Sequence, residues 1–278
     1  MIEYISGFLG NLPFAWLHHT FMQHALLAVL LVTPLFGLLS TMVVSNRMAF
    51  FSDSLGHGAF TGIALGALLG AVSPLMSLIA FSVLFAFFIT YIKHRSTAST
   101  DTIIGVFSST AIAVGLMLMS YGGSFNKFSA FLIGDILSIT VEDLQALLAV
   151  FVLVIVIWAW LFNQLLVLSL NQSFARSRGL KVFLTESLFA ATLAVVVAIS
   201  IQWVGLLIIN ALLVLPAAAA RNVAANVKQY HCLSVLIAFC SGVIGLILAY
   251  YCNMAAGATI VVVSSLFFFV TLAWRRND

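Results

Sequence analysis

Charged side chains are scarce in this chain of 278 residues. Asp, Glu, Lys and Arg make up 7% of the sequence, whereas about 25% is usual for a soluble domain. Hydrophobic residues make up 63%, and the mean hydropathy is +1.20. The apolar runs are long and continuous, unlike the short alternating strands of an outer-membrane barrel. The composition therefore predicts an all-α protein, a polytopic helical bundle within a membrane.

Further absences argue against other classes of function. The sequence has no G-x-x-x-x-G-K-[ST] phosphate loop, so any ATP hydrolysis that drives this protein must occur in another chain. We expect this chain itself to be no enzyme. No basic cluster is dense enough to follow a nucleic-acid backbone. Cys232, Cys240 and Cys252 lack metal-ligand spacing, which favours small apolar helix residues. The first residues carry no basic region before an apolar run, so no cleaved signal peptide is expected.

Nine apolar segments meet or approach the roughly 20 residues that a membrane-spanning helix needs. We expect nine spans, within a range of eight to ten, at residues 21–45, 50–72, 75–92, 102–120, 144–162, 184–203, 204–220, 232–252 and 256–274. If residue 21 lies outside, every basic cluster between these spans falls on one side, and only Lys127 does not. The positive-inside rule makes that side the cytoplasm. The sequence thus predicts a multi-pass membrane protein with a cytoplasmic C-terminus.

Three segments depart from simple spans within a single membrane domain of residues 1–278. Residues 1–20 indicate an interfacial segment on the outside. Residues 121–143 are too short and polar for a full span and indicate an external loop with a short re-entrant helix. Residues 163–183 are polar and basic, which predicts the longest cytoplasmic loop. Glu186 lies near the end of a segment and is expected to be a solvated helix-end carboxylate.

Residues 52–57 (SDSLGH) place a carboxylate and an imidazole four residues apart inside an apolar run. On a helix, Asp53 and His57 would project from the same face. An Asp within a bilayer costs several kcal/mol, and Asp with His is a ligand pair for a divalent transition metal. The pair favours a metal site inside the membrane. A proton relay and a purely structural hydrogen-bonded pair stay open as alternatives.

Three other histidines, His18, His19 and His24, cluster near the predicted outer face. Two interpretations are open for them. They could be accessory ligands that receive a metal at the entrance, or interfacial side chains whose polar tips reach water.

Pro216 is expected to break or kink a helix where that helix reaches the cytoplasm. The alanines at 217–220 allow close helix approach, and residues 221–228 (RNVAANVK) predict a short surface helix. This region is either a docking element for a cytoplasmic partner or an ordinary helix end with basic residues.

Six sequence blocks in order along the chain resemble the ABC-3 family, the membrane permeases of bacterial zinc, manganese and iron importers. They are MAFFSDSLGH at 48–57 with GIA at 62–64, DTIIGVF at 101–107, LIGDIL at 132–137, ARSRG at 175–179, LLVLPAAAAR at 212–221 and AGATIV at 256–261. They are spread over most of the chain, and their order makes the resemblance specific.

The resemblance implies a homodimeric permease of the type II, vitamin-B12-importer-like fold in the bacterial cytoplasmic (inner) membrane. It also implies a dimer of ATP-binding subunits on the cytoplasmic side and an extracytoplasmic metal-binding protein. Asp53 and His57 match the family's metal ligands within the membrane. Residues 216–228 match the region that meets the ATPase, and the coupling residues there would be Pro216, Ala217, Arg221, Asn222 and Lys228.

Two positions depart from the family pattern. Gly56 replaces the usual Ser before the histidine, which removes a hydroxyl beside the pair. Asn253 stands where many relatives have an Asp, and it would be a neutral accessory ligand. Asp53 and His57 would then carry more of the metal site than in the relatives.

We therefore expect the permease subunit of an ATP-driven importer for zinc, manganese or iron, with no permanently bound cofactor. The transported ion would pass Asp53 and His57. One alternative is a proton- or ion-coupled secondary metal transporter that uses the same pair as a relay. Another is a metal-sensing or scaffold protein without flux. The residues do not select the metal, because Asp and His accept all three ions.

Overall fold

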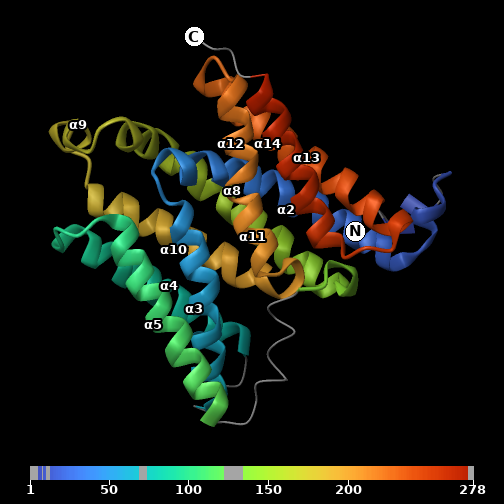
Figure 1. Cartoon of the computed structure of the whole chain (residues 1–278), viewed down its shortest axis with the longest axis horizontal. Coiled ribbons are helices and arrows are strands. Elements are labelled where there is room, and N and C mark those ends of the chain that lie inside the picture. The colour runs from blue at the N-terminus through green and yellow to red at the C-terminus, as the bar shows by residue number, and fades with distance from the viewer. Residues whose placement is uncertain (1–5, 8, 11–12, 69–73, 122–133, 275–278) are drawn as a thin grey trace. The chain divides into compact units, whose positions relative to one another are not determined.

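The computed structural model describes residues 6–7, 9–10, 13–68, 74–121 and 134–274 (Figure 1). Every regular element in these ranges is a helix, which confirms the predicted all-α class. The chain packs as two compact units, and each is described by itself. The predicted assignment of the whole chain to a single permease domain stays a prediction.

Seven of the helices are long and apolar enough to cross a membrane. They are α2 (Thr20–Ser45), α4 (Pro74–Arg95), α5 (Thr100–Tyr121), α8 (Val141–Leu170), α10 (Val182–Val204), α13 (Val227–Cys252) and α14 (Ala256–Ala273). Helix α3 (Ala49–Leu68) has 20 residues but is not among these seven, and it carries polar residues that include Asp53 and His57. The predicted segment 204–220 is divided between α11 (Leu206–Leu212) and α12 (Leu215–Val223). Each of the nine predicted segments thus has a helical counterpart.

The first unit contains α2, the first half of α8, the 3-10 helix η2 (Ile136–Ser138) and helices α11 to α14. Small residues bring α2 and α13 together, as in many membrane helix pairs. A Cβ atom on Gly37 would lie 2.8 Å from the Cβ atom of Ala238. The buried hydroxyls of Ser40 and Ser234 are 2.9 Å apart, and the Ser234 hydroxyl also donates to the Gly37 carbonyl at 2.6 Å. This close packing fixes α13, from which α12 and α14 are positioned.

The second unit contains α3, α4, α5, the second half of α8, the short helix α9 (Gln172–Ser177) and most of α10. Helix α3 packs against both α4 and α5. A Cβ atom on Gly58 would lie 3.1 Å from the Phe85 ring, so glycine permits the close approach of α4. The Thr61 hydroxyl donates to the Ala111 carbonyl of α5. Helix α3 is therefore held from two sides, and this support positions Asp53 and His57.

The structure differs from the sequence prediction in the loop at 163–183. Helix α8 continues to Leu170, and α9 begins at Gln172, so most of the predicted loop is helical. Within the predicted loop, the side-chain oxygen of Gln164 accepts a hydrogen bond of 2.9 Å from Thr185 of α10. A polar group with such a partner does not need to leave the helix to be satisfied.

Two other predicted segments lie partly outside the described residues. These are the interfacial segment at 1–20, described at 6–7, 9–10 and from residue 13 onward, and the external loop at 121–143, described at Tyr121 and from Gly134 onward. Within the first, residues 6–7 and 9–10 are helical, and the 3-10 helix η1 is described at Ala15–His18. The side of the membrane on which each segment lies stays a prediction.

Candidate functional site

Asp53 and His57 lie one turn apart on the same face of α3. The Nε2 atom of His57 is 3.6 Å from the Oδ1 atom of Asp53. Two ligand atoms that are each about 2.1 Å from a tetrahedral zinc ion would stand about 3.4 Å apart. The Asp53 side chain is 46% exposed, and the His57 side chain is 33% exposed. The pair therefore has the spacing of two ligands of one ion and is accessible to it.

The serines beside this pair are not directed toward it. The Ser52 hydroxyl donates to the Ala49 carbonyl at 2.8 Å, and the Ser54 hydroxyl donates to the Phe51 carbonyl at 2.9 Å. Both serines are fully buried. Gly56 is buried as well, and it supplies no side-chain ligand. The imidazole and the carboxylate are thus the two ligating groups that this stretch presents.

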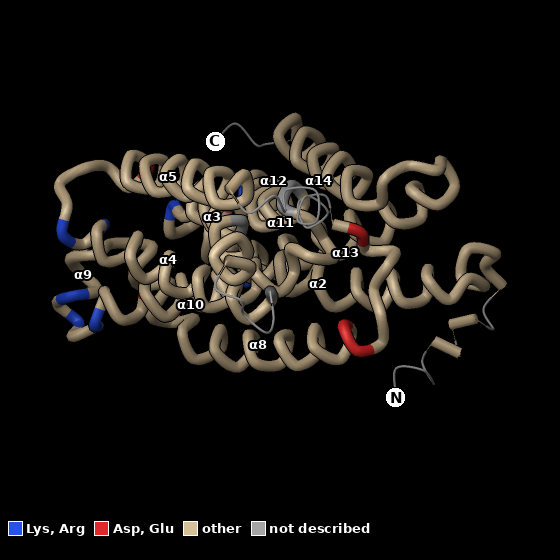
Figure 2. Tube along the Cα trace, turned by 90° about the horizontal axis from the view of Figure 1, so that it is seen from below, with Lys and Arg blue, Asp and Glu red and all other residues tan. Residues whose placement is uncertain are grey.

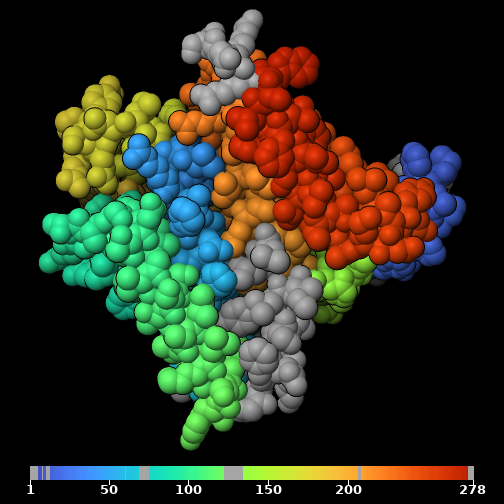
Figure 3. All heavy atoms as spheres, in the orientation of Figure 1, coloured from blue at the N-terminus to red at the C-terminus, as the bar shows by residue number. Residues whose placement is uncertain are grey.

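The same face of α3 continues from His57 to Thr61 and Leu65, each one turn further along. Thr61 and Leu65 line a cavity of about 420 Å³ whose other walls come from α4 and α5. The outer surface of α5 is uncovered in the space-filling view (Figure 3), and Val106 and Met117 are 60% and 63% exposed on it. The pair therefore belongs to a helix face that adjoins an apolar cavity.

A complete metal cage is not formed by the described part of the chain. No group of three or more His, Cys, Asp or Glu residues is close enough there to hold a metal ion. The remaining coordination positions would have to come from water, from backbone groups or from another chain. Two side-chain ligands suit an ion in transit better than a permanently bound one.

The predicted accessory residues lie in the first unit. The His19 ring is 6.0 Å from the Tyr250 ring, and Asn253 lines a cavity of about 570 Å³ together with Tyr250 and Met254. The structure thus brings His19 near this cavity, while His18 is exposed at the end of η1 and His24 is half-buried on α2. Their role as accessory ligands stays a prediction.

Asn253 also has a role in the backbone, which its departure from the family pattern did not indicate. It ends α13 with a left-handed conformation at φ 51°. Asn is one of the few residues other than Gly that adopt this conformation readily. The helix end therefore gives a reason for Asn at this position that does not depend on metal binding.

The predicted coupling residues surround a corner between α12 and α13. Pro216 lies in the first turn of α12 and is buried, and Ala217 is fully buried. Asn222 donates to the Thr271 hydroxyl of α14 at 3.2 Å. Arg221 and Lys228 are exposed. The predicted helical break is present just before Pro216, because α11 ends at Leu212 and α12 begins at Leu215.

The short surface helix predicted for residues 221–228 is wrong. Helix α12 ends at Val223, residues 224–226 form a corner, and α13 begins at Val227. The Asn226 side chain caps α13 by accepting from the Gln229 backbone N–H at 2.9 Å, as is usual for Asn at a helix start. We refer to residues 221–228 below as the coupling corner.

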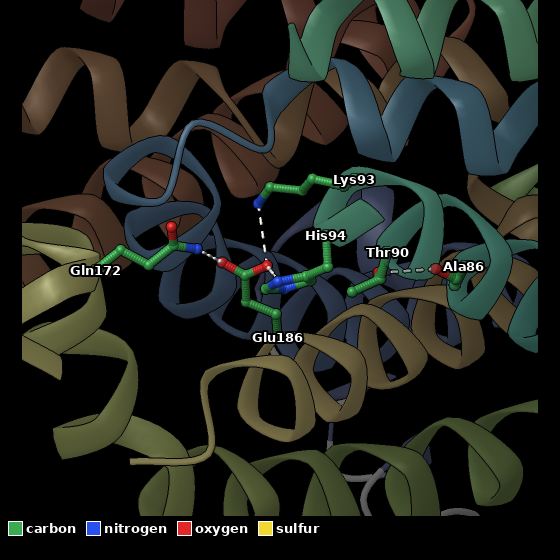
Figure 4. Close-up of polar contacts among 6 residues, drawn as sticks. All are labelled: Ala86, Thr90, Lys93, His94, Gln172 and Glu186. Carbon is green, nitrogen blue, oxygen red and sulfur yellow. Dashed lines mark hydrogen bonds and ion pairs between the residues drawn. The ribbon is translucent and has the colours of Figure 1, made fainter. Parts of the chain in front are cut away.

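A buried ionic cluster in the second unit was missed in the sequence. Glu186 is 7% exposed, and Lys93 donates to its Oε2 atom at 3.1 Å. The His94 Nε2 atom is 2.9 Å from the same oxygen, and Gln172 donates to Oε1 at 3.3 Å (Figure 4). The expectation of a solvated helix-end carboxylate is therefore wrong. The sequence pattern that could have predicted this cluster is the one seen at Asp53, a carboxylate within an apolar run, which needs a partner.

Comparison with known proteins places this chain in a family of membrane transport proteins. The chain matches the ABC 3 transport family over residues 18–275. It is 32% identical over 251 residues to the manganese import system permease protein ScaB of Streptococcus gordonii, with 90% of each chain covered. It is 28% identical over 247 residues to the high-affinity zinc uptake system membrane protein ZnuB of Buchnera aphidicola, with 88% of this chain and 94% of that protein covered.

Among solved structures, PsaBC from Streptococcus pneumoniae in complex with Fab is similar, with a TM-score of 0.79 and 30% sequence identity. The match covers 98% of this chain and 95% of that chain. The likeness confirms the predicted fold of a helical importer permease.

Proposed function

Because the chain belongs to the ABC 3 transport family, we propose that it is the membrane-spanning permease subunit of an ATP-driven importer for a divalent transition metal. The relatives that are named as manganese and zinc import permeases align with about nine-tenths of its length. Its seven long apolar helices are consistent with a multi-pass membrane protein. The observation that carries the proposal is the pairing of Asp53 with His57 on α3.

In this proposal the metal ion passes between the Asp53 carboxylate and the His57 imidazole. The neutral imidazole donates a nitrogen lone pair to the ion, and the carboxylate offsets part of its charge. A site with two protein ligands releases the ion more readily than a closed cage, as transport requires. Zinc, manganese and iron(II) all accept this pair, so the metal must be determined by experiment.

Transport by such a subunit needs partners. We propose an ATP-binding subunit on the cytoplasmic side, a metal-binding protein outside and a second copy of this chain. The coupling corner is suited to meet the ATPase, because its exposed cations project from a region fixed by buried Pro216 and Ala217. ATP binding would shift the permease between two states by favouring one of them.

The function is tested by metal accumulation in cells that lack their own importers. Cells that express this chain with its ATPase and binding protein should accumulate Mn²⁺, Zn²⁺ or Fe²⁺ above cells without the chain. A catalytically inactive ATPase should remove the difference. Accumulation that persists without any ATPase would contradict the proposal and would favour an ion-coupled transporter.

The coupling corner is tested by charge reversal. We expect Arg221→Glu combined with Lys228→Glu to reduce recovery of the ATPase in a pulldown by about tenfold or more, because like charges across an interface are costly. Arg178→Glu, at the residue that follows α9 in the second unit, reverses a charge outside the corner and is the control. Full recovery of the ATPase with the double variant would show that the corner does not dock it.

A further inference from the structure

A basic cavity lies where helix α4 ends and helix α10 begins. It has a volume of about 320 Å³ and is lined by His94, Arg176, Lys181, Val182, Phe183 and Leu184. This is roughly the space of ten water molecules at about 30 Å³ each. Figure 2 shows that Lys and Arg gather around α9 and the neighbouring end of α4. The cavity thus combines cationic groups with apolar walls.

Two of the residues that line the cavity, Arg176 and Lys181, are cations. Neither Arg176 nor Lys181 forms an ion pair with a carboxylate of the described residues. The nearby carboxylate of Glu186 is instead occupied by Lys93, His94 and Gln172. An anion in the cavity would therefore meet two cations that no described acidic group neutralises.

The Glu186 cluster also gives the cavity a fixed shape. It ties together α4 through His94, α9 through Gln172 and α10 through Glu186 itself (Figure 4). The His94 ring packs edge-on against the Phe183 ring at 5.3 Å, and both residues line the cavity. A preformed site of this kind loses less entropy when it binds a ligand.

The surface next to the cavity is apolar and aromatic. On α4, Phe88 and Tyr91 are 54% and 39% exposed, and on α10, Leu184 and Leu188 are 58% and 37% exposed. The Tyr91 ring is 6.5 Å from Phe183, which lines the cavity. A ligand in the cavity would thus carry its anionic group beside Arg176 and Lys181 and its hydrocarbon along α4 and α10.

We propose that this cavity binds an anionic phospholipid, with its phosphate between Arg176 and Lys181 and its acyl chains along the exposed faces of α4 and α10. Basic pockets between membrane helices are suited to anionic headgroups. The adjoining aromatic surface favours a lipid over a free anion, which would leave that surface uncovered. It also favours a lipid over a protein partner in water, because α4 and α10 are long and apolar enough to span a membrane.

Binding is tested with the purified full chain in detergent, by native mass spectrometry and by thermal stability. Phosphatidylglycerol should bind and raise the melting temperature, and phosphatidylcholine should do neither at the same concentration. Glycerol phosphate and inorganic phosphate should bind far more weakly than phosphatidylglycerol. Arg176→Gln and Lys181→Gln should each weaken phosphatidylglycerol binding by about fivefold, the contribution of one cation near a lipid surface.

Arg178→Gln is the matched control. It removes the same charge two residues away, on a side chain that lies over the Phe174 ring at 5.0 Å and does not line the cavity. It should leave phosphatidylglycerol binding unchanged.

Equal weakening by Arg176→Gln and Arg178→Gln would overturn the proposal, because the effect would then be one of overall charge. Equal binding of inorganic phosphate and phosphatidylglycerol would overturn the lipid as the ligand. Unchanged lipid binding in Arg176→Gln with loss of the ATPase in a pulldown would show a protein-docking surface instead.

Discussion

Asp53→Asn combined with His57→Ala is expected to lower metal affinity at the transport site by more than about 100-fold and to abolish uptake. Even groups that only support a metal ligand contribute about 10- to 100-fold to affinity, and this variant removes both side chains of α3 that we propose as ligands. Uptake of radiolabelled metal in cells that carry the complete importer measures the effect. Each single variant should retain some uptake, because one ligand is left.

Ser52→Ala is the control for this experiment. Its hydroxyl bonds to the Ala49 carbonyl of its own helix and does not point to the pair. We expect uptake close to that of the unaltered protein. Normal uptake by the Asp53 and His57 double variant, at normal abundance in the membrane, would show that the pair is structural.

Gly134→Ala is expected to destabilise the first unit by about 2–5 kcal/mol. Gly134 has a left-handed backbone with φ 63°, which costs an L residue about 1–2 kcal/mol. Its added Cβ atom would also lie 2.6 Å from the carbonyl carbon of Val204, and overpacking of this kind costs about 1–3 kcal/mol. Thermal unfolding of the purified protein in detergent should show a marked loss.

Two other glycines separate the causes of that loss. Gly179 also has a positive φ, of 77°, but a Cβ atom there would meet nothing within 4 Å. Gly179→Ala should therefore cost about 1 kcal/mol. Gly105 lies inside α5 with open space around it, so Gly105→Ala should be neutral or slightly stabilising. If Gly134→Ala melted at the same temperature as Gly179→Ala, the contact with Val204 would not limit stability.

The helices were the most predictable part of this protein, for a physical reason. A membrane-spanning helix forms its backbone hydrogen bonds within itself and needs a continuous run of apolar residues. Each span can therefore be predicted from a local stretch of sequence. This holds for α13 and α14, whose predicted and observed bounds nearly coincide at their C-terminal ends. The spacing of Asp53 and His57 was predictable in the same way, since helical geometry alone places them on one face.

What the sequence did not reveal depends on contacts between distant segments. Glu186 was expected to be solvated, but its carboxylate is bound by Lys93 and His94 of α4 and by Gln172 of α9. Helix α8 continues past Gln164 because Thr185 satisfies that side chain. In these two cases a polar side chain is satisfied by a partner distant in the sequence. The coupling corner is a local effect instead, because the Asn226 side chain caps α13 through the Gln229 N–H three residues further on.

The central claim is that this chain conducts a divalent metal when a separate ATPase drives it. Its most direct test is metal uptake into proteoliposomes that contain the chain and its ATPase, with the binding protein added outside and ATP enclosed inside. We predict uptake that requires both ATP and the binding protein and that stops in the Asp53 and His57 double variant. Uptake driven by a proton gradient in the absence of ATP would contradict the account.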